Sequence, residues 1–423
     1  MKDRRTGPRA ASRRLAKLAG GSLLSLAAAE VALAGGLQTA SSLRRRLKGE
    51  PKAGFPKREW PEIELESGDA RLKLYSDYEG LYEAMLEEIE GARERIFLET
   101  FIFKHEEVGR RFAGALAKKA QEGVEVHIVY DALASLSTSP ELFPEGVHVL
   151  PYGPISGPIS LLTPYNCVRD HRKILTVDGR VAFLGGFNFG VEYSAGWRDT
   201  HVRVAGDAVR DVEDAFAGLW NRRRTGPVPE ISLPRRRRAW NPATTLRVND
   251  PTMGLFPIRS MYLAPLDRAK ERIYLTSVYF VPSKAIKERL KDAARRNVDV
   301  QILVPWQTSY AVADRLARRQ FGELLEAGVR IFEYDGRYIH HAKTATVNGV
   351  WSTVGSANLD SLSLFGLHEV NLEVYSERFA EQMEGVFEMD KSVSEEVTLE
   401  KWRSRPLHAR LIEGALAPVR PFG

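Results

Sequence analysis

The chain has 423 residues, with 61 lysine and arginine residues against 55 aspartate and glutamate residues and a formal net charge of +6. This length predicts two or three domains' worth of chain, and a hydrophobic content of 43% excludes a disordered or fibrous protein. The single cysteine, Cys167, excludes an internal disulfide framework and any multi-thiolate metal site. The basic excess is local: residues 1–60 carry 14 basic and 4 acidic side chains, whereas residues 61–423 sum to −4.

The amino-terminal segment contains an apolar stretch long enough to span a bilayer. Residues 18–37 are apolar or small except for Glu30 and two serines, and basic clusters lie at 1–17 and 44–48. An anchor helix, a helix lying among lipid headgroups, a signal peptide cleaved near 32–34 and a disordered basic tail are the alternatives. Glu30 weakens the spanning alternative, because a carboxylate at mid-membrane costs about 2.5–3.5 kcal/mol. We expect membrane attachment.

From residue 61 onward, the same order of predicted elements occurs twice. Strands separated by helical patterns predict an α/β fold with two pseudo-symmetric halves, each a mostly parallel or mixed sheet with helices on both faces. We expect the active site at the interface of the halves. The matching strand-like segments are 97–103 and 274–281, then 124–129 and 298–304, and the helical stretches that close the halves are 209–220 and 377–389.

A segment rich in arginine and proline separates the two halves. Seven arginines against one glutamate give it a charge of +6, and its composition differs from that of both flanks. A solvated loop is the simpler interpretation, and a second contact with anionic headgroups is the alternative. The predicted organisation is a basic segment at 1–60, a first half at 61–225, a linker at 226–240 and a second half at 241–423.

Two His-x-Lys motifs are the strongest chemical signal in the sequence. They are His171-Arg-Lys173 and His341-Ala-Lys343, and the residues that follow them recur in one frame without a gap. A glycine lies 14 residues, an asparagine 17 residues and an acidic residue 28 residues after each histidine. Any one of these residues alone is usually structural, but their joint recurrence predicts a shared site. The recurring pairs are Gly185 and Gly355, Asn188 and Asn358, and Asp199 and Glu369.

The residue types in this frame suit a phosphate group. Strand alternation places the histidine and lysine of each motif on one face, so packing of the halves would gather two imidazoles, two ammonium groups and two amides. Lysines neutralise phosphate oxygens, and asparagine amides donate hydrogen bonds. One histidine can attack phosphorus while the other protonates the leaving oxygen, and Asp199 and Glu369 would fix the imidazole tautomers. The lysines would repel a metal cation, so we expect no metal and no cofactor.

The motifs resemble the signature of the phospholipase D superfamily, which is His-x-Lys-x4-Asp followed by Gly-Gly/Ser-x-Asn. Residues 171–178 and 185–188 match it fully, and the resemblance covers residues 61–423. The segments at 197–199, 279–282 and 355–360 look like the bacterial cardiolipin synthase branch. The resemblance implies that the first-motif histidine is the nucleophile and the second the general acid and base. The implied catalytic set is His171, Lys173, Asp178, His341, Lys343 and Asn348.

The second motif departs from the signature at Asn348, where the family usually has aspartate. Strand parity places this residue on the face opposite His341 and Lys343. Moreover, Asp178 and Asn348 each precede a glycine, a pair that favours a hairpin turn. An asparagine can keep such a turn without touching phosphate, so we expect Asn348 to be compatible with activity.

The resemblance implies a phosphatidyltransferase of cardiolipin synthase type, which moves a phosphatidyl group between phospholipids through a phosphohistidine intermediate. Phosphatidylglycerol is the expected substrate. With water as the acceptor, the same chemistry would make a phospholipase D, and motif spacing does not decide between the two. A nuclease would need a basic body, so no nucleic acid partner is expected. A lipid-binding protein without activity would lack a motif histidine or lysine, and both histidine–lysine pairs are present.

Several other residues near the motifs are weaker candidates. His201 lies two residues after Asp199 and can share its face, whereas His340 and His368 have the wrong parity and are predicted to be structural. Cys167 is predicted to be a small packed residue. The residues that could line the pocket just before the first motif are Tyr165, Asn166, Arg169 and Asp170.

We expect the protein at the cell membrane with its catalytic halves facing the cytoplasm. The side is weakly determined, because the basic residues flanking the apolar stretch balance to +6 before it and +5 after it. The sequence makes no prediction of the oligomeric state.

Overall fold

The computed structural model describes residues 56–405 apart from 66–69, 105, 137, 139–142, 155–167, 191–196, 226–227, 235–242, 309–310 and 335–338. The apolar stretch at 18–37 therefore lies outside the described residues, as do Tyr165, Asn166, Cys167 and much of the predicted linker. Within the described part, none of the helices combines the length and apolar character needed to cross a membrane.

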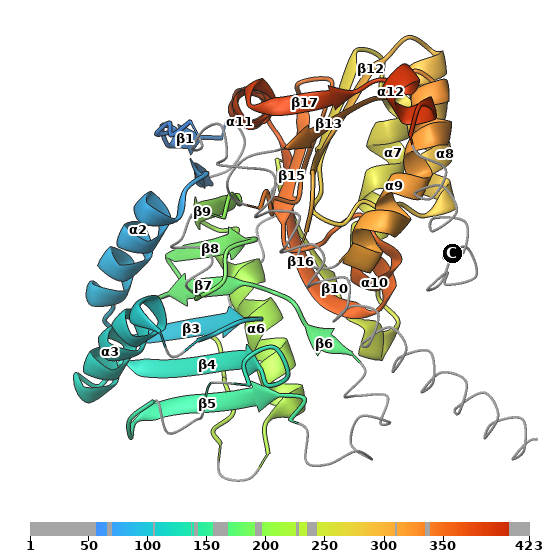
Figure 1. The fold of residues 1–423 in the computed structure, drawn as a ribbon. Helices are drawn as coiled ribbons and strands as arrows, with labels where there is room; N and C mark the ends of the chain where they lie inside the picture. Colours follow the sequence, from blue (N-terminus) through green and yellow to red (C-terminus); the bar gives the residue numbers. More distant parts are fainter. Residues whose placement is uncertain are drawn as a thin grey trace, which may run out of the picture.

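Two mixed β-sheets form the framework of the described chain (Figure 1). The first has the order β1-β2-β9-β8-β7-β3-β4-β5, and the second has the order β10-β16-β15-β14-β11-β12-β13-β17. In each, a parallel set (β3, β4 and β5, or β11, β12 and β13) continues into antiparallel strands. The first-sheet strands are β1 (Ile63–Glu64), β2 (Arg71–Tyr75), β3 (Arg95–Thr100), β4 (Glu125–Asp131), β5 (Val147–Tyr152), β7 (Ile174–Val177), β8 (Val181–Gly185) and β9 (His201–Ala205). The second-sheet strands are β10 (Thr244–Asn249), β11 (Arg272–Thr276), β12 (Asp299–Pro305), β13 (Arg330–Tyr334), β14 (Thr344–Val347), β15 (Trp351–Gly355), β16 (Leu367–Tyr375) and β17 (Ser394–Val397).

Helices cover both faces of each sheet, as the alternation of elements predicts (Figure 1). Successive strand residues point to opposite faces, so Ile96 of β3 packs with α2 and α3 while Phe97 packs with α6. In the second half, α7, α8 and α9 share one core and α11 lies on the other face. The helices are α2 (Tyr78–Glu90), α3 (Glu107–Gln121), α6 (Val209–Arg223), α7 (Pro257–Arg268), α8 (Lys284–Arg295), α9 (Ala311–Glu326), α10 (Ser361–Phe365), α11 (Glu377–Ser392) and α12 (Leu399–Arg403), with a 3-10 turn, η3 (Pro251–Met253).

The helices predicted to close the halves form where the apolar spacing placed them. On α6, Val209, Val212, Phe216 and Trp220 recur at helical intervals and are buried. The α11 helix begins at an N-cap serine, Ser376, whose side chain accepts a hydrogen bond from the backbone of the first turn. The predicted linker falls between the end of α6 and the start of β10, and its boundaries remain a prediction.

The halves meet along a shared apolar core and two short crossed strand contacts. Side chains of β8 and β9 pack with those of β15 and β16 in one cluster. The short strand β6 (Arg169–Asp170) pairs with the start of β16, and Arg198 forms the corresponding bridge with His340. The segment before each motif histidine thus lies against the acid-bearing segment of the other half.

Candidate active site

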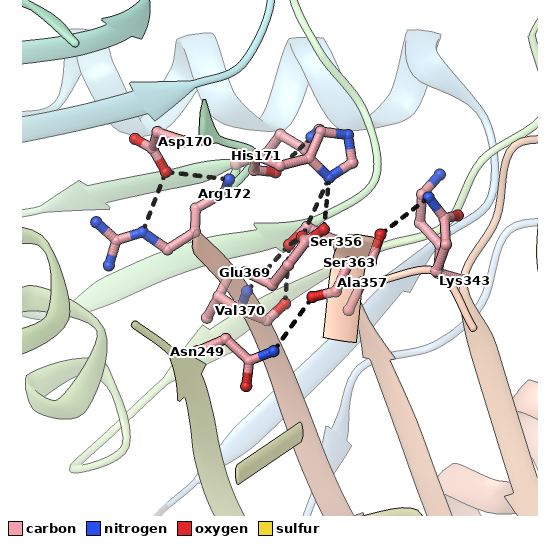
Figure 2. Close-up of polar contacts among 12 residues, drawn as sticks. Asp170, His171, Arg172, Asn249, Lys343, Ser356, Ala357, Ser363, Glu369 and Val370 are labelled. Atoms are coloured by element: carbon pink, nitrogen blue, oxygen red, sulfur yellow. Dashed lines mark hydrogen bonds and ion pairs between the residues drawn. The ribbon is translucent and has the colours of Figure 1, made fainter. Parts of the chain in front are cut away.

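The crossed contacts bring the two motif histidines to one interface, each beside a carboxylate of the other half. Glu369 places its two oxygens 3.0 and 3.1 Å from Nδ1 of His171 (Figure 2). Asp199 Oδ2 lies 2.6 Å from Nδ1 of His341. Both carboxylates are fully buried. Each motif histidine therefore contacts a carboxylate of the opposite half, a crossing that spacing along the chain does not reveal.

These contacts set the orientation of both imidazoles. A carboxylate only accepts hydrogen bonds, so we assign the Nδ1 proton to each histidine, which leaves the Nε2 lone pair as the reactive group. The carboxylates are themselves held: Ser356 Oγ donates to Glu369, and the Thr200 amide donates to Asp199 at 2.8 Å. The main chain adds to this positioning, because the His171 amide donates to the His368 carbonyl at 3.0 Å.

Both lysines of the motifs are buried beside the histidines. Lys173 Nζ donates to the His171 carbonyl at 2.5 Å, and Lys343 Nζ lies 2.7 Å from His341 Nδ1 and 3.6 Å from Asp199. Burial, together with repulsion between the two ammonium groups, lowers the pKa of Lys173 to about 7. Burial lowers the pKa of Lys343 to about 8 against the opposing effect of Asp199. Two partly desolvated cations at one interface form a site that favours an anion.

The same environment keeps both imidazoles neutral near pH 7. Burial and then Lys343 lower the pKa of His341 to about 3. Burial also lowers the pKa of His171, and Glu369 opposes this change. A neutral imidazole with an open Nε2 is a nucleophile, whereas a general acid needs a proton. An anionic phosphate bound near His341 would raise its pKa and thereby favour the protonated form.

The two motif asparagines are buried near the interface in different settings. Asn188 Oδ1 accepts a hydrogen bond from the Ile102 amide at 3.1 Å. Asn358 Nδ2 lies 3.5 Å from Ser363 Oγ at the start of α10, and its buried Oδ1 lacks a hydrogen-bond partner within the described part of the chain. The amides therefore lie at equivalent sequence positions without equivalent contacts.

Comparisons with known proteins identify the family to which the chain belongs. The family model described as "Cardiolipin synthase, PLD-like domain" matches residues 85–220 and 262–391. A cardiolipin synthase of Listeria monocytogenes serotype 4a is 33% identical over 368 residues, which cover 84% of this chain and 76% of that protein. A cardiolipin synthase of Staphylococcus aureus strain N315 is 32% identical over 367 residues, covering 84% and 74%. The chain belongs to the cardiolipin synthase family.

Two solved structures share the fold of this cardiolipin synthase family member. Phosphatidylserine synthase of Haemophilus influenzae superposes with a TM-score of 0.65 at 12% identity, covering 90% of this chain and 98% of that one. Polyphosphate kinase of Porphyromonas gingivalis gives a TM-score of 0.53 at 15% identity, covering 86% and 56%. The enzyme is therefore a phosphatidyltransferase of the phospholipase D superfamily.

Asp178 and Asn348, which complete the family motifs, lie away from the histidines of this cardiolipin synthase family member. Both residues have positive φ, +54° and +53°, in the turns that follow β7 and β14. Asp178 accepts hydrogen bonds from the amides of residues 93–95 at 2.8–3.0 Å, and Asn348 accepts two at 3.0 Å from residues 270–271. In the strand register His171 lies near Glu99, whereas Asp178 lies at the opposite end, beside Arg95. These contacts hold the two turns, and a catalytic role for Asp178 and Asn348 remains a prediction from the motif.

Two of the pocket-lining candidates are engaged in buried ion pairs. Arg169 contacts Asp131 at 2.6 Å, and Asp170 contacts Arg172 at 3.4 Å, while Arg172 also reaches Glu99 at 2.5 Å (Figure 2 shows Arg172 directed to Asp170). This cluster anchors the strand before the nucleophile candidate. A pocket-lining role for Arg169 and Asp170 remains a prediction.

The remaining histidines have contacts outside the motifs. His340 Nε2 lies 2.8 Å from Asp390, and His368 Nε2 lies 3.1 Å from Tyr152 Oη, contacts that fit structural roles. His201 is buried against Gly185, and both of its ring nitrogens lack hydrogen-bond partners within the described chain. No group of three potential metal-ligating side chains occurs in that part of the chain.

Two aromatic rings beside the histidines were not singled out as site residues in the sequence. The ring centroid of Phe101 lies 4.8 Å from that of His171, and the Lys173 ammonium lies 5.3 Å from the same ring. Trp197 lies 5.3 Å from His341, centroid to centroid. Phe101 directly follows β3, and Trp197 lies two residues before Asp199. No periodicity in the sequence marks either residue. Their apolar surfaces suit the neighbourhood of a lipid glycerol and acyl chain.

Proposed function

We propose that this enzyme forms cardiolipin by transferring a phosphatidyl group from one phosphatidylglycerol molecule to another. The observation that carries the proposal is the pairing of two buried histidine–lysine units across one interface, each histidine held by a carboxylate of the other half. One phosphodiester can occupy such a site and meet an imidazole on either side. Membership of the cardiolipin synthase family supports the choice of lipid.

In the first step, Nε2 of His171 attacks the phosphorus of the donor lipid. The bond between phosphorus and the headgroup oxygen breaks, and His341, entering as an imidazolium, gives its proton to that oxygen. Glycerol leaves, and a phosphatidyl-histidine remains. Lys173 and Lys343 neutralise the charge that develops on the phosphoryl oxygens, and we assign hydrogen bonding of these oxygens to the Asn188 and Asn358 amides.

In the second step, the terminal hydroxyl of a second phosphatidylglycerol attacks the same phosphorus. His341, now neutral, removes the hydroxyl proton as the bond between phosphorus and nitrogen breaks. The products are cardiolipin and the original His171 imidazole, and His341 is again protonated for the next cycle. Water in place of the lipid hydroxyl would yield phosphatidic acid.

A site of this kind needs access to lipid, and the sequence supplies a means of attachment. We propose that residues 18–37 and the basic clusters on both sides hold the enzyme at the cell membrane, with the halves at 61–225 and 241–423 on the cytoplasmic side. The arginine-rich linker at 226–240 supports a second contact with anionic headgroups.

The test is incubation of the purified full-length enzyme with phosphatidylglycerol in detergent, followed by mass spectrometry of the lipids. We expect cardiolipin together with released glycerol. Phosphatidic acid alone would show that the enzyme hydrolyses the lipid and does not transfer the phosphatidyl group. Absence of both products would overturn the proposal. Mass spectrometry of the acid-sensitive adduct separates the histidine roles: a phosphatidyl group on His341 instead of His171 would reverse them.

A further inference from the structure

The catalytic groups all lie at one end of the two sheets. In the first sheet this is the end at which β3 and β4 finish, next to Phe101 and His171. In the second sheet it is the end at which β10 finishes and β16 begins, because Asn249 pairs with Glu369. The turn containing Asn348 marks the opposite end. Each sheet therefore has a site end and a far end.

Exposed apolar side chains are concentrated at the site end. Leu133 and Leu136 follow β4, and the others follow β10 or lie on α10. The α10 helix leads directly into β16 (Figure 1). The two exposed apolar side chains at the far end are in the β14–β15 turn and the last residue of β16. Among the large apolar side chains of the described residues, the exposed ones at the site end are Leu133, Leu136, Met253, Leu255, Leu362 and Phe365, and those at the far end are Val350 and Tyr375.

The α10 corner of this surface is rigidly built. Leu362 and Phe365 lie one helical turn apart and are 57% and 37% exposed, while the residues between them are buried. Asn249 donates to the carbonyls of Ser363 and Leu364 at 3.2 and 3.3 Å, and it accepts from the first turn of α7 (Figure 2 shows Asn249 beside Ser363). Because buried hydrogen bonds hold this corner in place, exposure of its apolar residues is a property of the fold.

The charges at this corner favour an anionic surface. Residues 249–259 and 361–367 contain one acidic side chain, Asp250, and one basic side chain, Arg259. Asp250 is buried and neutralised by Arg222 at 2.6 Å. Arg259 lies 5.4 Å from the Phe365 ring, so a cation stands directly beside the most bulky exposed side chain of α10. Apolar side chains next to a guanidinium are typical of surfaces that enter the headgroup layer of a bilayer.

We propose that the site end docks directly on an anionic phospholipid bilayer through a surface made of Met253, Leu255, Leu362 and Phe365, with Arg259 among the headgroups. We call these five residues the docking surface. Asn358 and Asp360 directly precede α10, so docking would place the catalytic entrance at the headgroup layer. The inference rests on the proposed function for its choice of lipid. It goes beyond the amino-terminal attachment, because it specifies which side of the catalytic halves faces the lipid.

A local fluorescence measurement tests this docking without depending on catalysis. In the full-length chain with Cys167→Ser, Leu362→Cys carries a polarity-sensitive dye, and Val350→Cys at the far end carries the same dye as a matched control. When vesicles of phosphatidylglycerol are added, we expect the dye emission to shift to the blue at position 362 and not at position 350. The shift at position 362 should be smaller with phosphatidylcholine vesicles, and also when Arg259→Gln is introduced. Equal responses at both positions, or no response at 362, would overturn the proposal.

The same probe identifies other occupants of the docking surface. If the 18–37 segment or a second copy of the chain covered it, the dye at position 362 would report an apolar environment before vesicles were added. That result would also overturn the proposal. Failure of the proposed function is distinguishable, because then no lipid product forms while the vesicle-dependent shift at position 362 persists.

A kinetic comparison tests the consequence for substrate supply. Leu362→Ser with Phe365→Ser should lower the rate on phosphatidylglycerol vesicles at least about tenfold, since two large apolar side chains no longer enter the lipid. The rate on short-chain phosphatidylglycerol below its micelle concentration should stay unchanged. Val350→Ser should alter neither rate. An equal loss on dispersed and vesicular substrate would place the effect in the fold and contradict docking.

Discussion

At the scale of single residues, the crossed carboxylates hold the two motif histidines in the same way. We assign a proton to Nδ1 of each imidazole, because a buried carboxylate accepts a hydrogen bond there, and this leaves Nε2 as the reactive nitrogen on both. The two carboxylates differ in their surroundings. Burial acts to raise the pKa of Asp199, but Lys343 and His341 outweigh burial and hold the pKa below its ordinary value.

Substitution of Glu369 by glutamine should lower the rate of phosphatidyl-histidine formation by about 10²- to 10⁴-fold, the range expected when the orienting carboxylate of a catalytic histidine is lost. The measurement uses a phosphatidyl ester with a nitrophenol leaving group, which needs no proton. Asp199→Asn is the control, because it affects the acid-providing histidine and should leave this particular step nearly unchanged. Equal losses in the two variants on this substrate would contradict the assigned roles.

The lysine pKa values predict the pH dependence of the free enzyme. A lysine is a cation below its pKa, so kcat/KM should fall as pH rises above about 7, where Lys173 loses its proton, and more steeply above about 8, where Lys343 follows. In the complex the phosphate anion favours the ammonium forms, so the fall in kcat should occur at higher pH. The Lys173→Arg variant, whose guanidinium stays charged, should lack the fall in kcat/KM that begins above about pH 7. A profile that stays flat to pH 9 would refute this explanation.

At the scale of elements, the turns after β7 and β14 explain why the last motif position tolerates exchange. Each turn residue adopts positive φ and bonds to the backbone that leads into the neighbouring strand, β3 or β11. The contact requires an oxygen acceptor, which both aspartate and asparagine supply. The turn thus fixes one end of the hairpin whose other end carries the histidine and lysine.

Asn348→Asp should therefore leave turnover within a few-fold of the parent enzyme. An increase by orders of magnitude would show that this position acts on phosphate. Kinetic measurement with phosphatidylglycerol in detergent decides between these results.

Asp178→Ala should destabilise the fold more than it impairs the chemistry. The substitution removes the acceptor for the amides of residues 93–95 and places alanine at positive φ, at a combined cost of about 2 kcal/mol. Urea unfolding should show the lower stability, while kcat of the folded enzyme stays within a few-fold. Loss of turnover without loss of stability would support a catalytic role for Asp178.

At the scale of the whole molecule, a buried ionic network joins the two halves next to the site. Arg198 of the first half contacts Asp390 of the second at 2.8 Å, and Asp390 also contacts His340. The Arg198 carbonyl accepts a hydrogen bond from the His341 amide at 2.6 Å. The network therefore ties the packing of the halves to the position of one catalytic imidazole.

Asp390→Ala should lower the free energy of unfolding by about 3–5 kcal/mol, because the Arg198 guanidinium would stay buried without its counter-charge. Activity should fall together with stability. Asp390→Asn, which keeps a hydrogen-bonding group, is the milder control. Differential scanning calorimetry and the lipid assay measure the two effects, and an unaltered unfolding temperature in the alanine variant would contradict the role of the network.

The sequence by itself determined the repeated α/β halves, the paired motifs and the residue types of the site. These features are local: helical and strand periodicities, turn dipeptides such as Asn348-Gly349 and fixed spacings from each histidine are all readable along one stretch of chain. Strand parity was also sufficient to separate Asn348 from the motif residues on the other face. The resemblance to the phospholipase D superfamily then implied the activity.

Only the tertiary structure decided which carboxylate serves which histidine, because Glu369 and His171 are 198 residues apart and meet through the packing of the halves. The Arg198–Asp390 pair and the contact of Trp197 with His341 also depend on the packing of the halves, whereas Phe101 meets His171 through the folding of the first half alone. The site end of the sheets is likewise a tertiary property, since strand direction and register bring the turn after β10 and the helix α10 to the end of the sheet that carries Glu369. Side-chain pairs between halves depend on long-range packing, which short-range patterns do not encode.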